Sequence, residues 1–197
     1  MTTAGRQAGL ALAVAGLVAG CGADDDLPEG APGGPPPPGF ATEILAAHNA
    51  VRAAATPTPD PPLPALAWSE SAAATAQAWA DGCVYAHNPR LRELSLGENI
   101  AATAPPGNRG ATEVVGLWAS EAPYYDLATH TCETANPPNE AGTCGHYTQL
   151  VWRGTTTVGC GVRTCTTGSP FGESAPRWDY WVCDYAPPGN WVGQRPY

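Results

Sequence analysis

The cysteines constrain the fold of this chain more than any other feature. Of the seven cysteines, Cys21 stands apart near the start of the 197-residue chain. The other six are Cys83, Cys132, Cys144, Cys160, Cys165 and Cys183. Six cysteines can pair completely, and an exported compartment permits disulfides. A zinc ribbon needs cysteines paired two residues apart, and none are so spaced. We therefore expect three disulfides.

The first 39 residues have the character of an export signal followed by a tether. Arg6 precedes a short apolar run that cannot span a bilayer, and small residues lead directly into Cys21. We interpret residues 1–20 as a lipoprotein signal peptide and Cys21 as the lipidated residue. The alternative is an ordinary signal peptide with a coincidental cysteine. Residues 21–39 are rich in Pro and Gly, which predicts an extended, solvated tether.

These features predict an exported lipoprotein that is anchored at a membrane and faces the periplasm or the cell exterior. Net charge is -9, and lysine is absent. A nucleic-acid footprint requires clustered Lys and Arg, so we expect no nucleic-acid partner. We expect the protein to be a monomer.

The remaining residues, 40–197, form one predicted domain with helices early and strands late. Apolar spacing predicts a first helix capped by Thr42, a second that follows Ser69 and ends near Gly82, and a third over residues 112–122. Runs of β-branched and aromatic residues then predict two antiparallel strands. These strands cover residues 157–162 and 178–183, and residues 99–101 add a third, short strand. The order indicates an α+β fold with helices packed on an antiparallel sheet.

Four titratable residues stand out because each lies beside a structural boundary. They are His87, Glu98, Glu121 and His146. If they converge, two close carboxylates would raise one pKa, and the two neutral imidazoles could hold Zn²⁺ or another divalent cation. Spacing alone does not establish convergence. Glu121 falls on the apolar side of the third helix, where the alternative is an ion pair with an arginine. His48 lies on a buried helical face, which favours a hydrogen-bonded core residue over a ligand.

Several motifs resemble those of the CAP superfamily of cysteine-rich secretory, antigen-five and pathogenesis-related proteins, also called the SCP domain. Residues 145–152, with the sequence GHYTQLVW, resemble its first signature, and residues 180–191 resemble its second. Gly97-Glu98-Asn99-Ile100 and the positions of His48, Arg52 and Trp118 follow the family's order. The likeness covers residues 40–197 and is closest to plant class-one pathogenesis-related proteins.

The resemblance implies a three-layer α-β-α sandwich with a central antiparallel sheet and a cleft lined by the four titratable residues. It also implies a short helix at residues 146–152, where periodicity alone allows a strand. The implied disulfides are Cys83–Cys165, Cys132–Cys144 and Cys160–Cys183. Trp181 and Asp184 depart from the residues usual in the second signature, which puts the hydrogen bonds at that strand end in doubt.

Three functional hypotheses follow from the sequence and the resemblance. The first is a non-catalytic domain that binds a lipid, a sterol-like molecule or a cell-surface partner, with a divalent metal in the cleft. The second is a metal-dependent hydrolase or peptidase, with His87 and His146 as metal ligands and Glu98 or Glu121 as general base. The third is a structural or adhesive module whose His and Glu side chains only close the core.

Overall fold

The computed structural model describes residues 1–2, 36–133 and 143–197. The signal-peptide interpretation, Cys21 and most of the tether therefore lie outside the described residues. The elements in chain order are α1 (Phe40–Ala53), β1 (Ala67–Trp68), α2 (Glu70–Ala80), α3 (Leu91–Leu94), β2 (Gly97–Thr103), α4 (Ala111–Ala119), the 3₁₀ turn η1 (Ala122–Tyr124), β3 (Tyr125–Asp126), β4 (Thr131–Cys132), α5 (Gly145–Leu150), β5 (Thr157–Cys165), the 3₁₀ turn η2 (Gly172–Ser174) and β6 (Trp178–Ala186).

The central sheet has the strand order β1-β5-β6-β2. β5 pairs with β6 and β6 with β2 in antiparallel register, as the sequence predicts. β1, however, pairs with β5 in parallel, with Ala67 opposite Thr157. The predicted α+β sandwich is confirmed, but its sheet is mixed rather than wholly antiparallel. The physical reason is that the two residues before α2 run along the free edge of β5.

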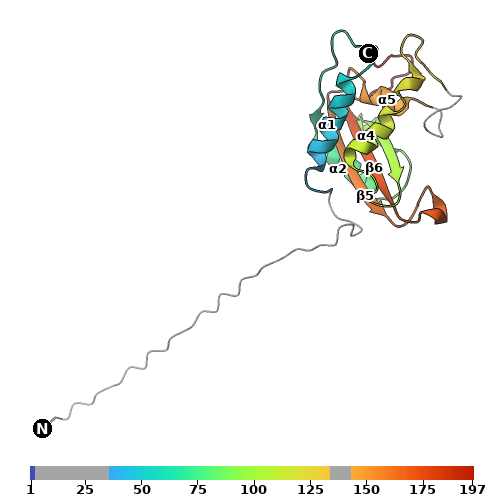
Figure 1. The fold of residues 1–197 in the computed structure, drawn as a ribbon. Coiled ribbons are helices and arrows are strands. Elements are labelled where there is room, and N and C mark those ends of the chain that lie inside the picture. Colours follow the sequence, from blue (N-terminus) through green and yellow to red (C-terminus); the bar gives the residue numbers. More distant parts are fainter. Residues whose placement is uncertain (3–35, 134–142) are drawn as a thin grey trace.

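Helices cover both faces of the sheet (Figure 1). α1, α4 and α5 pack together on one face, and α2 lies on the other, over β5 and β6. The approach of α2 is close because two β5 residues beneath it have no side chain. A Cβ at Gly159 would clash with the backbone nitrogen of Ala73, and one at Gly161 would lie 2.5 Å from the Cα of Gln77. The small alanine side chains of α2 and these two glycines together allow the helix to pack closely on β5.

The helix ends show which local signals decide a boundary. Ser69 caps α2 as predicted, since its hydroxyl accepts a hydrogen bond from the backbone nitrogen of Ala72 at 3.2 Å. The prediction that Thr42 caps α1 is wrong. The helix instead begins at Phe40, two residues before Thr42. Its N-cap is Gly39, which has a positive φ of 83°. Starting at Phe40 places that ring on the buried face with Ile44 and His48.

Residues 145–150 form the helix that the resemblance implies, not a strand. Six residues are too few for a stable isolated helix, so tertiary contacts must hold α5. At its start, the backbone nitrogen of Tyr147 donates to the carboxylate of Glu121 at 3.0 Å. At its end, the Arg52 guanidinium donates to the carbonyl of Leu150 at 2.8 Å.

Three disulfides join the pairs that the resemblance implies: Cys83–Cys165, Cys132–Cys144 and Cys160–Cys183. The first connects the loop after α2 to the end of β5. The second ends at Cys144, two residues before His146, and the third joins directly paired residues of β5 and β6. In the part of the chain that the structure describes, no helix has the length and apolarity needed to cross a membrane.

Candidate functional site

The structure joins the four titratable residues into two His–Glu pairs, which together we call the His/Glu site. In the first pair, Nδ1 of His87 lies 2.7 Å from Oε1 of Glu98. The same oxygen accepts the backbone nitrogen of Asn88 at 3.0 Å. The side chain of Glu98 is fully buried, whereas 57% of the His87 side chain is exposed. The buried carboxylate therefore anchors a largely exposed imidazole through Nδ1.

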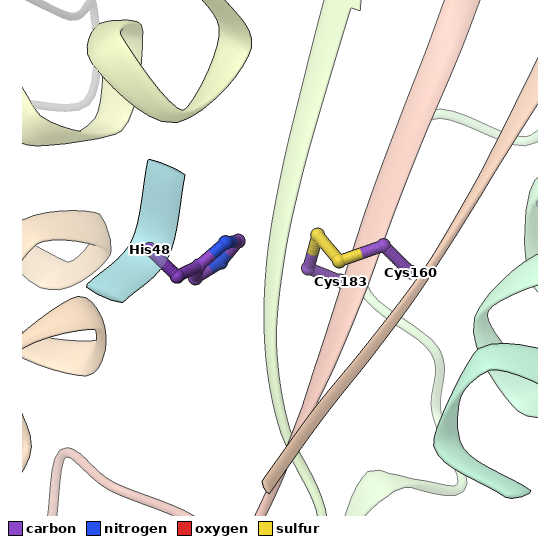
Figure 2. A group of neighbouring side chains, drawn as sticks. All are labelled: His48, Cys160 and Cys183. Atoms are coloured by element: carbon purple, nitrogen blue, oxygen red, sulfur yellow. A yellow bond between two sulfur atoms is a disulfide. The ribbon is translucent and has the colours of Figure 1, made fainter. Parts of the chain in front are cut away.

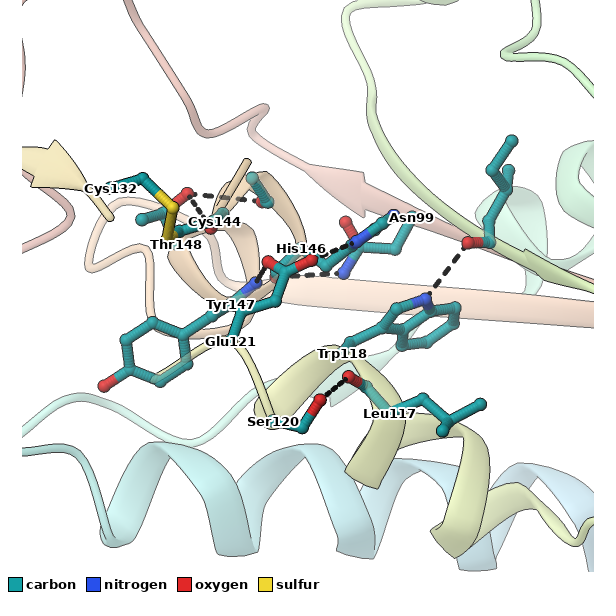
Figure 3. Close-up of polar contacts among 12 residues, drawn as sticks. Asn99, Leu117, Trp118, Ser120, Glu121, Cys132, Cys144, His146, Tyr147 and Thr148 are labelled. Carbon is teal, nitrogen blue, oxygen red and sulfur yellow. Dashed lines mark hydrogen bonds and ion pairs between the residues drawn. A yellow bond between two sulfur atoms is a disulfide. The ribbon is translucent and has the colours of Figure 1, made fainter. Parts of the chain in front are cut away.

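The second pair has the same design, with its residues on α5 and just after α4 (Figure 3). Nδ1 of His146 lies 2.6 Å from Oε1 of Glu121, while Oε2 accepts the backbone nitrogen of Tyr147. The carboxylate is buried, and the imidazole is 25% exposed and stacks on Trp118. Among the described residues, the ion pair of Glu121 is with His146 rather than with an arginine, the alternative left open above.

Strand β2 connects the two pairs. Glu98 is its second residue, and the next residue, Asn99, donates its side-chain amide to the carbonyl of His146 at 3.1 Å. Successive residues of a strand point to opposite faces. β2 is the edge strand of the sheet, so the first pair lies beside its α2 face and the second beside its α5 face. The motif Gly97-Glu98-Asn99 thus serves both pairs.

Each imidazole of the site retains one unbonded nitrogen. A carboxylate that accepts from Nδ1–H fixes the tautomer in which Nε2 carries the free lone pair. Within the described residues, Nε2 of His87 and of His146 have no hydrogen-bond partner. This is the state of a histidine prepared to ligate a metal, with the glutamates as orienting groups.

Elsewhere in the described residues, three possible ligand atoms lie within 4.8 Å of one another. They belong to His48, Cys160 and Cys183 (Figure 2). The two sulfurs are bonded to each other, so neither is a thiolate that could bind a metal. Nδ1 of His48 donates to the carbonyl of Ile44 at 2.7 Å, and Nε2 accepts from the hydroxyl of Tyr185 at 2.9 Å. Burial lowers the pKa of His48 to about 4. His48 is a neutral core residue, as its helical position favours.

Two buried ionisable residues outside the predicted set, Arg52 and Asp184, lie near the site. Arg52 was quoted only as part of a motif, yet it donates to the carbonyls of Pro64, Leu150 and Trp152 at 2.8–2.9 Å. Asp184 was noted only as a departure from the family pattern. It keeps its place in the β6 ladder opposite Glu98, so the strand pairing survives the substitution. Its side chain is fully buried, and burial raises its pKa to about 8, with the nearby charge of Glu98 contributing.

Two close acids were expected to raise the pKa of one of them. The carboxyl group whose pKa is raised in this way is that of Asp184, beside Glu98. The sequence placed that expectation on Glu98 and Glu121. Glu121 lies with His146, on the other face of the edge strand. The signal that could have identified the true pair was the β2–β6 register, which no local pattern reveals.

Comparison with known proteins gives matches over most of the domain. A family model described as "CAP: Cysteine-rich secretory protein family" matches residues 45–185. The human protein named peptidase inhibitor R3HDML is 34% identical over 156 residues, which cover 78% of this chain and 61% of that protein. Mouse peptidase inhibitor 16 is 38% identical over 150 residues, which cover 76% of this chain and 28% of that protein. The chain thus spans less than two thirds of the length of these relatives.

Solved structures have the same fold. BmVAL-1 is 26% identical with a TM-score of 0.63, and the alignment covers 84% of this chain and 85% of that one. Venom allergen-like protein 4 of Schistosoma mansoni is also 26% identical, with a TM-score of 0.58 and coverage of 80% and 93%.

Proposed function

This chain belongs to the cysteine-rich secretory protein (CAP) family, and on that premise we propose that it is an exported, non-catalytic binding protein whose His/Glu site holds a divalent cation. His87 and His146 would be the protein ligands, each through Nε2. Because the two pairs lie beside the two faces of β2, the imidazoles would have to meet around the free edge of that strand. One observation carries the proposal: both histidines donate Nδ1–H to a buried glutamate, at 2.6–2.7 Å. Carboxylates in this position raise ligand basicity and fix ring orientation.

The donor set fits Zn²⁺ or a related borderline cation. Two imidazoles leave the remaining coordination positions to water or to a bound ligand. A cation held there supplies positive charge that attracts carboxylate or carbonyl groups of a partner. The protein's own residues orient the imidazoles and keep both carboxylates out of water.

The hydrolase alternative has less support. A catalytic zinc usually has three protein ligands. Among the described residues, no three side chains of the His/Glu site bring their ligand atoms within 4.8 Å of one another. Glu98 and Glu121 also each accept a backbone N–H in addition to contacting the imidazole, which favours a role in orientation over one in proton transfer.

Calorimetric titration of the chelator-treated protein with Zn²⁺ tests this proposal. We expect saturable binding that is lost in the double variant His87→Ala/His146→Ala. Glu98→Gln should weaken the affinity about 10- to 100-fold because it removes the orienting carboxylate. His130→Ala is the matched control, since Nδ1 of this histidine contacts the hydroxyl of Tyr125 and no carboxylate. Equal zinc affinity in the double variant and the control would contradict the proposal.

A second candidate function is binding of a lipid or sterol-like molecule, and a specific hollow favours it. Its volume is about 620 Å³, within the range typical of small-ligand sites. It is lined by Pro57, Tyr125, Asp126, Leu127, Ala128, Arg195 and Tyr197. The apolar groups suit an acyl chain. Arg195, which donates Nε and Nη2 to the carbonyls of Leu127 and Ala128, presents a cationic group suited to a carboxylate.

Fluorescence titration with a labelled fatty acid and with its methyl ester tests the second candidate. Leu127→Asn should weaken binding of both probes because it places an amide in the apolar hollow. Arg195→Gln should weaken binding of the acid about tenfold and leave the ester unchanged, since only the acid offers a charge-assisted hydrogen bond. Binding of the acid that neither variant alters would exclude this hollow as the site.

The names of the relatives raise a third role, inhibition of a peptidase at the cell surface. A panel of secreted peptidases assayed with and without the purified domain separates this role from hydrolysis by the chain itself. Reduced turnover of a peptidase supports inhibition. Chelator-sensitive cleavage of peptides by the domain alone would support the hydrolase alternative.

A further inference from the structure

Asp184 lies next to the His/Glu site without belonging to either pair. It is directly opposite Glu98 on β2 and opposite Gly159 on β5. Residues that face each other across an antiparallel pair project to the same side of the sheet. Ile100 and Val182, two residues along, pack with Ala76 of α2. Asp184 and Glu98 therefore share the face beneath α2.

Three carboxylate oxygens on this face have no partner. Oε2 of Glu98 and both side-chain oxygens of Asp184 are buried and accept no hydrogen bond from the described residues. The buried positions of α2 are all alanines, namely Ala72, Ala76 and Ala80, and these offer no side-chain donor. Two adjacent ionised carboxylates in such a place would lack both solvation and a counter-charge.

The other ionisable groups on the surrounding elements do not supply Asp184 with a hydrogen bond. They are Asp179, Tyr180 and Tyr185 on β6, Arg163 on β5, Glu70 and Asp81 at and just beyond the ends of α2, and His87, which is bonded to Glu98. Asp179 accepts from the backbone nitrogen of Gly107 and the hydroxyl of Thr164. Arg163 lies 3.4 Å from Asp81 instead. Tyr180 donates to the carbonyl of Ala86 and Tyr185 to His48. None is hydrogen-bonded to Asp184.

We propose that Asp184 is a protonated carboxylic acid at neutral pH and donates its proton to Oε2 of Glu98, which makes it a positioning residue for His87. A neutral acid removes the repulsion between the two side chains and supplies the missing donor to the unpartnered oxygen of Glu98. Oε1 of Glu98 keeps its contact with Nδ1 of His87. Burial and the neighbouring Glu98 charge, which raise the pKa of Asp184 to about 8, agree with this arrangement.

The proposal predicts how stability depends on pH. The pKa of Asp184 is raised above the usual 3.8, so the folded state retains a proton that the unfolded state has lost. Its contribution is fully present below about pH 4 and decreases as pH rises toward about 8. One extra bound proton corresponds to about a tenfold fall in the folding equilibrium constant for each pH unit in that window.

The experiment compares wild type, Asp184→Asn and Asp184→Leu by urea unfolding between pH 4 and 9 in chelator-treated buffer. Asparagine keeps an N–H donor toward Glu98 at every pH, so this variant should lack the decline attributed to Asp184. Infrared spectra should show a protonated-carboxyl band in wild type at pH 6 that disappears by pH 10 and is absent in Asp184→Asn. A decline of equal slope in wild type and Asp184→Asn, or no such band, overturns the proposal.

The effect of Asp184 on zinc affinity rests on the proposed function. It is measured separately from the pH dependence and the infrared spectra. Asp184→Leu, which offers no donor, should bind Zn²⁺ about tenfold more weakly than Asp184→Asn, because Glu98 loses its support. The pH and infrared results are independent of zinc. If they hold while wild type binds no zinc, only the proposed function fails. If Ca²⁺ or Mg²⁺ at pH 7 stabilises wild type but not Asp184→Asn, the pair is a cation site and the proton assignment is wrong.

Discussion

Arg52→Leu is expected to lower the free energy of unfolding by about 4 kcal/mol, since each lost hydrogen bond to a charged group costs about 1.5–3 kcal/mol. The guanidinium is buried and donates to the carbonyls of Pro64, Leu150 and Trp152, of which only the last is seen to accept a second donor, the backbone nitrogen of Thr155, among the described residues. Leucine fills most of the volume of the arginine's aliphatic part. The loss of stability therefore comes from the lost hydrogen bonds to the carbonyls rather than from a cavity. Urea unfolding followed by tryptophan fluorescence measures it.

Arg92→Leu on α3 is the matched control for charge and residue type. Arg92 is exposed, and its replacement should change stability by no more than about 0.5 kcal/mol. Arg52→Lys should fall between the two, because an ammonium cannot reproduce the planar fork. Since Arg52 bonds the last carbonyl of α5, Arg52→Leu should also weaken zinc binding through His146. A loss of less than 1 kcal/mol would show that these carbonyls find water or other donors.

The second large effect is expected on removing the Cys83–Cys165 disulfide with alanine at both positions. This bond joins residues 82 apart in sequence. The chain-entropy estimate for such a loop is about 4.5 kcal/mol. Cys165 is buried, and Cys83 has a positive φ of 51° at the start of the loop that carries His87. The double variant should therefore lose both stability and zinc affinity.

The Cys132–Cys144 disulfide provides the comparison within the same protein. It joins residues only 12 apart, for which the same estimate gives about 3 kcal/mol. Differential scanning calorimetry of the two alanine pairs should give the lower melting temperature for the long loop. The reverse order would mean that local packing around His146 outweighs chain entropy.

Local patterns in the sequence were sufficient for the regular elements. Ser69 caps α2, the β-branched and aromatic runs became β5 and β6, and His48 is buried where helical spacing places it. Each of these features depends on neighbours within a few residues. The mixed sheet was missed because β1 is only two residues long, and two residues carry no period.

The site was predictable as a set of residues but not as an arrangement. Motif order singled out His87, Glu98, Glu121 and His146, yet the division into two pairs on opposite faces of β2 depends on strand register. Asp184 shows the same limit. Its sequence neighbours identify it as a strand residue, and only the register with Glu98 turns it into a buried, unpartnered acid.

By itself, then, the sequence determined the disulfide count, the helices and strands with strong local signals, the family resemblance and the titratable residues of the site. Periodicity left residues 145–150 open between strand and helix, and the resemblance implied the helix; tertiary contacts hold it, from Glu121 at one end and Arg52 at the other. Tertiary structure alone decided which carboxylate faces which imidazole. The reason is physical: a short helix or a buried charge depends on partners 26 to 98 residues away, and their contacts exist only after the chain has folded.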